Sequence, residues 1–294
     1  MNLFKDNLLN TLLDRKKRYI PVRETVKRWR KNRHRKYSVL DFNDIKTSVK
    51  SSDTIFILGT GSSIKQITDE HWKFISSHDS FGLNWWALHQ FVPTYYYSEY
   101  PHGRVFFDKY LSLLGPKFTA EYADTLFFLS FNRAVRRGIH PKVTSELFPE
   151  NSKVCFFNYE KPLRFESENS ITPDDFRRTL FHRGTLTAVL ELVRRIGYKR
   201  IVLLGVDLVN HSYFYDNYPE MQWSDDLAYL SSALERAEKP YFAVESFSRR
   251  KFGLHDYLFK AYDLYYKPEG IEFFTGSKES LLAEKIPVFD FNEA

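Results

Sequence analysis

A loop with two glycines follows an apolar run and is the first stretch of the chain that could do chemistry. Residues 55–67 read IFILGTGSSIKQI, with Gly59 and Gly61 in the turn. A dinucleotide-binding fingerprint would put a third glycine where Ile64 stands, and a P-loop would end in Gly-Lys-Ser/Thr. Because glycines let a backbone approach a ligand closely, the loop remains a candidate cradle for phosphate.

A second candidate anion site lies in the stretch HRGTLTA, residues 182–188. Arg183 stands just before an expected helix, and Gly184 and Thr185 stand at its start. Free N–H groups and the helix dipole favour an anion at this position, and a guanidinium adds two parallel donors. The alternative interpretation is an ordinary helix cap beside a surface arginine.

Two further residue types could act on a bound substrate. His255 stands at the start of an expected helix and could serve as a general base, although a lone histidine also often has a structural role. Tyr213 lies in the aromatic stretch HSYFYDNY and could donate to phosphate without adding charge, or it could simply pack. The spacing of the other histidines predicts no metal site.

The elements that must position these residues alternate between strand and helix. Apolar runs predict strands, and 3.6-residue periodicity with caps predicts helices, which together indicate an α/β fold with a doubly wound, mostly parallel, Rossmann-like sheet. The predicted strands are 54–58, 80–84, 94–98, 199–207 and 271–276, and the predicted helices are 68–77, 184–197 and 254–267. Residues 208–252 are aromatic and polar, and we expect a helical insert or lid there.

Polar residues stand at the ends of several of these strands. The glycine loop follows the first, Asn84 ends the second, Ser98 and Glu99 end the third, and Asp207 ends a later one. In open α/β sheets, ligands bind beyond the carboxyl ends of the strands. The sequence therefore predicts a ligand crevice at that edge of the sheet.

The charge is concentrated in one segment of the 294-residue chain. Residues 1–36 contain 13 Lys/Arg and 3 Asp/Glu, whereas the remainder has 30 basic and 34 acidic residues. We therefore expect no nucleic-acid binding by the folded body, a basic helical extension over residues 1–50, and a single Rossmann-like domain over 51–294. The basic helix suits an anionic membrane surface, but a solvated helix or a dimerisation arm fits as well.

Cysteine content and hydropathy indicate the compartment. The single Cys155 excludes a disulfide framework and a multi-cysteine zinc site, and no apolar run approaches the roughly 20 residues of a membrane helix. We expect a cytoplasmic protein, peripheral on the inner membrane face if the basic segment docks there. The chain also lacks an Asp-x-Asp pair, which many nucleotide-diphosphate sugar transferases use to hold a metal.

Three blocks of sequence resemble bacterial sialyltransferases of glycosyltransferase family 42. They are FILGTGSSI, HRGTLTAVLELVRRIGYKRIVLLGVDL and FGLHDYLFKAYDLYYKPEGIEFFTGSKESLLA. The resemblance spans roughly residues 53–290 and implies a modified Rossmann-type fold of the GT-A-variant kind with a flexible lid. It also implies a metal-independent enzyme, without cofactors, that uses a CMP-linked sialic acid and inverts the anomeric centre.

The resemblance implies a role for each matching residue. His255 matches the general base, Tyr213 a lid tyrosine that binds the departing phosphate, and Arg183 an active-site arginine. The implied nucleotide- and donor-binding residues are Gly59, Thr60, Gly61, Ser62, Asn84, Gly184, Thr185, Asp207 and Ser277.

Departures from the family pattern widen the choice of donor. Thr60 replaces an asparagine, Val209 stands where a second phosphate-binding tyrosine is expected, and Ser98 or Glu99 replaces another asparagine. The expected function is transfer of a sialic acid or a related ulosonic acid, such as Kdo, from a CMP-sugar to a hydroxyl of a bacterial surface glycan. The alternatives are a UDP- or GDP-sugar transferase on the same fold and a non-catalytic, membrane-docked binding module. A homo-oligomer stays open.

Overall fold

The computed structural model describes residues 37–98, 104–130, 151–157, 184–209, 212–219 and 254–292. The basic segment 1–36, Arg183, Glu99 and most of the expected insert 208–252 lie outside the described residues.

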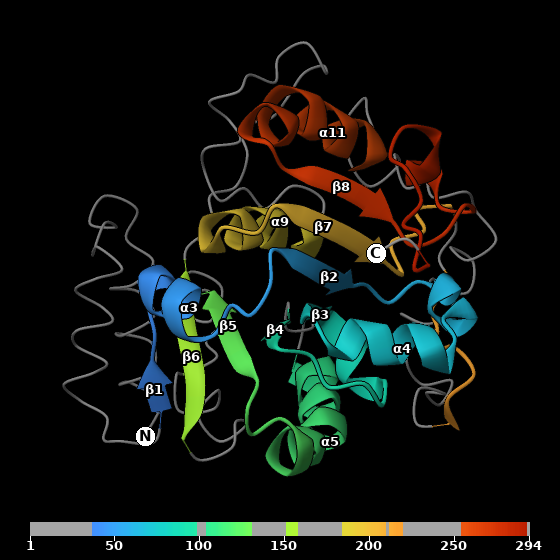
Figure 1. Cartoon of the computed structure of the whole chain (residues 1–294). Helices are drawn as coiled ribbons and strands as arrows, with labels where there is room; N and C mark the ends of the chain where they lie inside the picture. Colours follow the sequence, from blue (N-terminus) through green and yellow to red (C-terminus); the bar gives the residue numbers. More distant parts are fainter. Residues whose placement is uncertain are drawn as a thin grey trace, which may run out of the picture.

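The described part of the chain forms one eight-stranded sheet in which all paired strands are parallel (Figure 1). The strand order is β1-β6-β5-β4-β3-β2-β7-β8. The strands are β1 (Tyr37–Val39), β2 (Thr54–Leu58), β3 (Asp79–Leu83), β4 (Tyr95–Tyr97), β5 (Leu126–Ser130), β6 (Ser152–Phe157), β7 (Arg200–Leu204) and β8 (Glu272–Thr275). The prediction of a parallel α/β sheet is confirmed.

Helices cover both faces of this sheet and divide the core into two clusters. One cluster contains buried residues of α3 (Phe42–Ser48), α9 (Thr185–Ile196) and α11 (Leu254–Ala261). The other contains buried residues of α4 (Asp69–Ser76) and α5 (Arg104–Glu121). The sheet is therefore doubly wound, as the sequence predicts.

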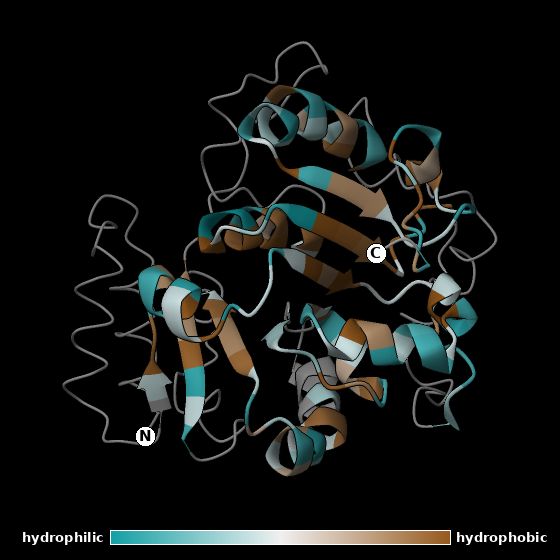
Figure 2. Cartoon of the chain, viewed as in Figure 1, coloured by the Kyte–Doolittle hydropathy of each residue, from teal (hydrophilic) through white to brown (hydrophobic). Residues whose placement is uncertain are grey.

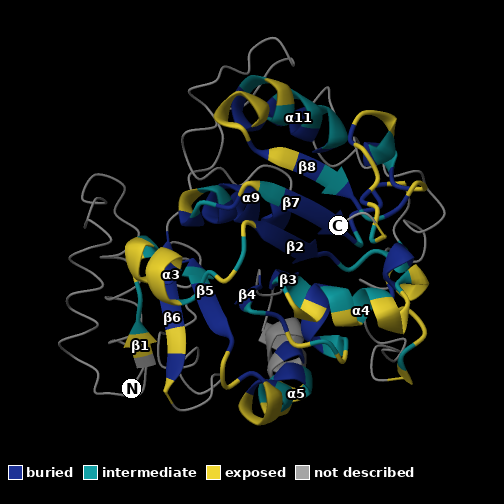
Figure 3. Cartoon of the chain, in the orientation of Figure 1, coloured by how far each residue is buried: buried dark blue, intermediate teal, exposed yellow. Residues whose placement is uncertain are grey.

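The neighbouring strands β2 and β7 are apolar on both faces because helices cover both. Every residue of β2 is buried, and so are the last four of β7. Figure 2 shows both strands mostly in brown and Figure 3 shows them in dark blue. A continuous apolar run is what a parallel strand buried on two sides requires.

Local signals also set the predicted helix boundaries. The Thr68 side chain caps α4 by accepting from the His71 N–H group, and Gly197 ends α9 with a φ of 98°. The helix predicted over residues 254–267 is α11, which continues as a π-helix over Tyr262–Tyr266.

Residues 37–50, predicted to belong to the N-terminal extension, contain a strand of the sheet and a helix that packs on it. Strand β1 pairs with β6, and Ile45 of α3 is fully buried in the core beneath α9. Asp41 starts α3 with a capping box, in which its side chain accepts from Asn43 and Asp44. This part of the chain therefore belongs to the sheet domain.

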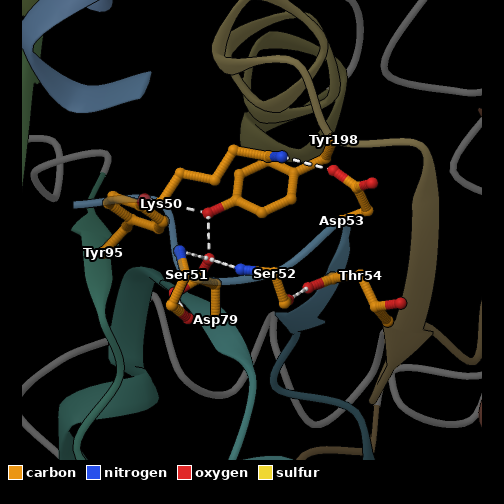
Figure 4. A network of polar contacts seen from close by, with 8 residues as sticks. All are labelled: Lys50, Ser51, Ser52, Asp53, Thr54, Asp79, Tyr95 and Tyr198. Carbon is orange, nitrogen blue, oxygen red and sulfur yellow. Dashed lines mark hydrogen bonds and ion pairs between the residues drawn. The ribbon is translucent and has the colours of Figure 1, made fainter. Parts of the chain in front are cut away.

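A buried carboxylate ties together the amino-terminal edge of the sheet (Figure 4). Asp79, only 2% exposed, accepts from the Ser51 N–H group at 2.7 Å, the Ser51 hydroxyl at 2.8 Å and the Ser52 N–H group at 3.2 Å. The Tyr198 hydroxyl also donates to Asp79 at 2.7 Å and lies 2.9 Å from the Tyr95 hydroxyl. Burial, together with Tyr95 and Asp79, raises the pKa of Tyr198 far above its usual value.

Replacing Asp79 with asparagine is expected to lower the free energy of unfolding by about 3 kcal/mol, because one amide oxygen cannot accept from four donors. The matched control is Asp53→Asn. The Asp53 side chain is 71% exposed where it pairs with Lys50, so its loss should cost less than about 1 kcal/mol. Urea unfolding followed by circular dichroism measures both. Equal effects of the two substitutions would show that the Asp79 network contributes no special stability.

Candidate functional site

The topology of the sheet places its switch point between β2 and β7. Strands β3 to β6 follow β2 on one side, whereas β7 and β8 lie on its other side. Ligands of open α/β sheets bind beyond the carboxyl ends of the strands at such a point. The loops that leave β2 and β7 are therefore the first place to look for a site.

The glycines in these two loops allow them to pack backbone to backbone. The Gly59 N–H group donates to the Leu204 carbonyl at 2.7 Å, and the Gly61 N–H group donates to the Gly205 carbonyl at 2.8 Å. A Cβ atom on Gly59 would lie 2.5 Å from the Gly205 carbonyl oxygen, and one on Gly61 would lie 2.7 Å from it. The structure thus gives both glycines a packing role between strand ends.

Asp207 holds the glycine loop from the other side. Its buried carboxylate accepts from the Ser63 N–H group at 3.0 Å, from the Ser63 hydroxyl, and from the Ser62 hydroxyl at 3.5 Å. Its backbone carbonyl accepts from the Leu281 N–H group at 2.9 Å. Asp207 therefore fixes the conformation of the glycine loop, and its effect on a bound ligand would act through that loop.

The first described part of the expected lid pairs with the glycine loop. The Ser62 N–H group donates to the Ser212 carbonyl at 3.1 Å, and the Phe214 N–H group donates to the Thr60 carbonyl at 3.1 Å. An antiparallel bridge joins Gly61 and Tyr213. Residues 212–215 thus form a short strand-like segment on the loop.

Alternation along this segment puts its two tyrosines on one side. The rings of Tyr213 and Tyr215 stack at 5.2 Å with 6° between their planes. Tyr213 is 37% exposed, whereas the Tyr215 side chain is buried and hydrogen-bonds Thr60. Burial, with Tyr213 and Asp216 nearby, raises the pKa of Tyr215 well above its usual value. The Tyr215 phenol therefore stays protonated at neutral pH and can act as a donor.

Asn84 and Thr185, which the sequence predicts separately, meet at the end of β3. The Thr185 hydroxyl donates to the Asn84 side-chain oxygen at 3.1 Å, and the Tyr96 hydroxyl donates to the Asn84 carbonyl. Gly184 is the N-cap of α9. The hydrogen bond therefore brings the start of α9 over the carboxyl end of β3.

Two of the three described non-glycine residues with a positive φ lie at this edge, whereas the third, Asn151, precedes β6 at the opposite edge. Asn84 and Leu208 have φ angles of 53° and 58°, and they follow β3 and β7 respectively. A positive φ is tolerated by asparagine but is an outlier for a bulky leucine. Such strain is concentrated at functional sites in proteins, which supports this edge as the site.

His255 lies at this edge on the face of the sheet that α9 and α11 cover, whereas Phe214 and Tyr215 pack on the other face. Helix α11 leads into the parallel strand β8 and must run against it, so the start of α11 lies at the carboxyl edge. The His255 Nε2 atom lies 3.0 Å from Asp256 Oδ1, and its ring packs edge-on against Phe259. Both of these contacts come from residues of α11 itself.

Ser277 stabilises its own turn. The Glu279 N–H group donates to the Ser277 hydroxyl at 3.1 Å, and the nearby Ser280 hydroxyl donates to the Val206 carbonyl at 2.7 Å. The turn therefore supports the loop that carries Asp207.

Gly205, which is central to this site, is not among the site residues predicted from the sequence. Its signal in the sequence is a glycine directly after a buried strand and two residues before Asp207. Ser63 lies in the same glycine loop, and its pairing with Asp207 has no sequence signal.

Comparison with known proteins gives no relative: the chain matches no family model and no curated protein. Among the described residues, no group of three or more His, Cys, Asp or Glu side chains is placed to hold a metal ion. In the same part of the chain, none of the helices combines the length and the apolar composition needed to span a membrane.

Proposed function

We propose that this protein is a glycosyltransferase that moves a sialic acid or a related ulosonic acid from a CMP-sugar to a hydroxyl of a glycan. The proposal rests on two contacts near the switch point of the sheet. Asn84 and Thr185 are hydrogen-bonded to each other, and the glycine loop pairs with the segment that contains Tyr213. Residues from separate blocks of the family resemblance would thus contribute to one donor site.

The donor phosphate would be recognised mainly by side chains. The N–H groups of Gly59, Gly61, Ser62 and Ser63 already donate within the protein. Recognition would therefore use neutral donors such as the Tyr213 hydroxyl, together with Arg183 and the start of α9. Neutral donors suit CMP, because its single phosphate carries less charge than a diphosphate.

The proposed reaction is a single displacement. The acceptor oxygen bonds to the anomeric carbon, the bond from that carbon to the phosphate oxygen breaks, and CMP leaves with the electron pair. His255 takes the acceptor proton, and the adjacent Asp256 carboxylate stabilises the imidazolium that forms. Tyr213 donates to the departing phosphate.

A thermal-shift panel with CMP, CTP, UDP and GDP tests the donor assignment. At about one hundred times the dissociation constant, CMP is expected to stabilise the folded protein by about 2.7 kcal/mol, or roughly 5 °C in Tm. UDP and GDP should give no shift. Asn84→Ala should abolish the CMP shift, whereas Asn292→Ala, on the C-terminal turn with Asp290, should keep it.

The outcome separates the alternatives. A shift with UDP or GDP instead of CMP would support a different nucleotide-sugar transferase on the same fold. A CMP shift without transfer from CMP-sialic acid or CMP-Kdo to any glycan acceptor would support a binding module. No shift with any nucleotide would overturn the proposal.

A further inference from the structure

His89 is a partly buried histidine that packs against the segment carrying Tyr213. It directly follows the short helix Asn84–Leu88. Its ring lies 4.5 Å from the Trp86 ring, 4.8 Å from the Trp72 ring and 5.5 Å from the Phe214 ring. Phe214 is 2% exposed. The rings of His89, Trp72, Trp86 and Phe214 therefore form one aromatic cluster, which contacts residues 212–215 through Phe214.

The hydrogen bond from the Phe91 N–H group to the His89 ring requires the neutral imidazole. The Phe91 N–H group donates to His89 Nδ1 at 3.1 Å, so the ring proton must sit on Nε2. Lys117 of α5 donates to the His89 carbonyl at 2.7 Å and is paired with Glu121 at 3.9 Å. Burial, and to a lesser extent the Lys117 charge, lowers the pKa of His89 to about 4.

We propose that protonation of His89 releases residues 212–215 from the glycine loop, so that this edge of the sheet opens in acid. A proton on Nδ1 would face the Phe91 N–H group, and the new positive charge would lie within the aromatic cluster and beside Lys117. From the elements packed against the ring, α4, the 84–88 helix and residues 212–215 contribute aromatic rings, and α5 contributes the ammonium group.

Release of Phe214 would free the tyrosines on either side of it. The Phe214 N–H group donates to the Thr60 carbonyl, and the Phe214 ring packs against His89 and Trp86. Losing this anchor would detach Tyr213 from Gly61. The expectation that this detachment inactivates the enzyme rests on the proposed function. The contacts of Phe214 with His89, Trp86 and Thr60 do not depend on it.

The direction of the pH effect follows from the lowered pKa. A histidine whose pKa is lower in the closed form holds that form closed above its ordinary pKa of 6.5 and loses this contribution as the pH falls towards 4. After allowance for solvent screening of a partly exposed ring, the opening constant should be about tenfold larger at pH 5 than at pH 7.5.

Amide hydrogen exchange at Phe214 in the full chain, without nucleotide, tests the proposal. After correction for the intrinsic pH dependence of exchange, the Phe214 amide of the wild type should exchange about tenfold faster at pH 5 than at pH 7.5. His89→Asn keeps an acceptor for the Phe91 N–H group and cannot be protonated. The corrected exchange rate of Phe214 in this variant should therefore be the same at pH 5 and pH 7.5. The control His78→Asn, which removes a histidine packed on Phe56 and Phe74, should behave as the wild type.

A second measurement needs no variant. In an NMR titration of the wild type, the His89 ring and the Phe214 amide should change with the same midpoint. Separate midpoints, or pH-independent corrected exchange at Phe214 in the wild type, would overturn the proposal, and so would a persistent pH effect in folded His89→Asn. Because no nucleotide is present, a failed CMP panel would leave this result intact.

Discussion

Gly205→Ala is expected to lower the free energy of unfolding by about 4 kcal/mol, because it combines backbone strain with a clash between two loops. Gly205 has a φ of 63°, and an added Cβ atom would lie 2.6 Å from both the Gly59 carbonyl oxygen and the Ile64 side chain. Relief would require the loops after β2 and β7 to separate. Urea unfolding measures the stability, and CMP binding by the folded fraction measures the site.

Gly270→Ala is the matched control for this substitution. Gly270 has a similar φ of 70°, but an added Cβ atom would have nothing within 4 Å. It should therefore cost only the conformational strain, about 1 kcal/mol. If both substitutions cost the same, close packing of the two loops is not what requires glycine at position 205.

His255→Ala is expected to lower kcat for transfer from a CMP-sugar by about 10³-fold, since general-base catalysis contributes 10²–10⁴-fold. CMP affinity should not change, because the imidazole is proposed to act on the acceptor rather than on the nucleotide. Steady-state kinetics with CMP-sialic acid or CMP-Kdo, alongside calorimetric CMP titration, separate these two effects.

Two variants make this test specific. His78→Ala removes a histidine from the opposite face of the sheet and should leave kcat within about twofold, as expected for a substitution away from the site. Asp256→Asn keeps His255 and should give an intermediate loss, because the imidazolium loses its carboxylate partner. Full activity of His255→Ala would remove the base assignment.

Several elements could be predicted because their signals are local. The β2 run Thr54–Leu58 is apolar throughout, Thr68 caps α4, and Gly197 ends α9 in the left-handed region. Each depends on neighbours within a few residues in the sequence, so periodicity and capping rules identify it.

Other elements went unpredicted because their identity depends on distant partners. The run Tyr37–Val39 becomes a strand by pairing with β6, more than a hundred residues later in the chain. Strands β5 and β6 are short apolar runs that pattern alone does not distinguish from buried helix segments. Pairing between neighbouring strands resolves the ambiguity.

The sequence by itself determined the parallel α/β class, the caps, and the strand-end positions of Asn84, Asp207 and the glycine loop, because these follow from local periodicity and chain direction. Only the tertiary structure decided what those residues touch. It packs the glycines on Gly205, pairs Asp207 with Ser63, and hydrogen-bonds Thr185 to Asn84. Such contacts join residues more than a hundred positions apart, and the order of strands in the sheet, rather than the spacing in the chain, brings them together.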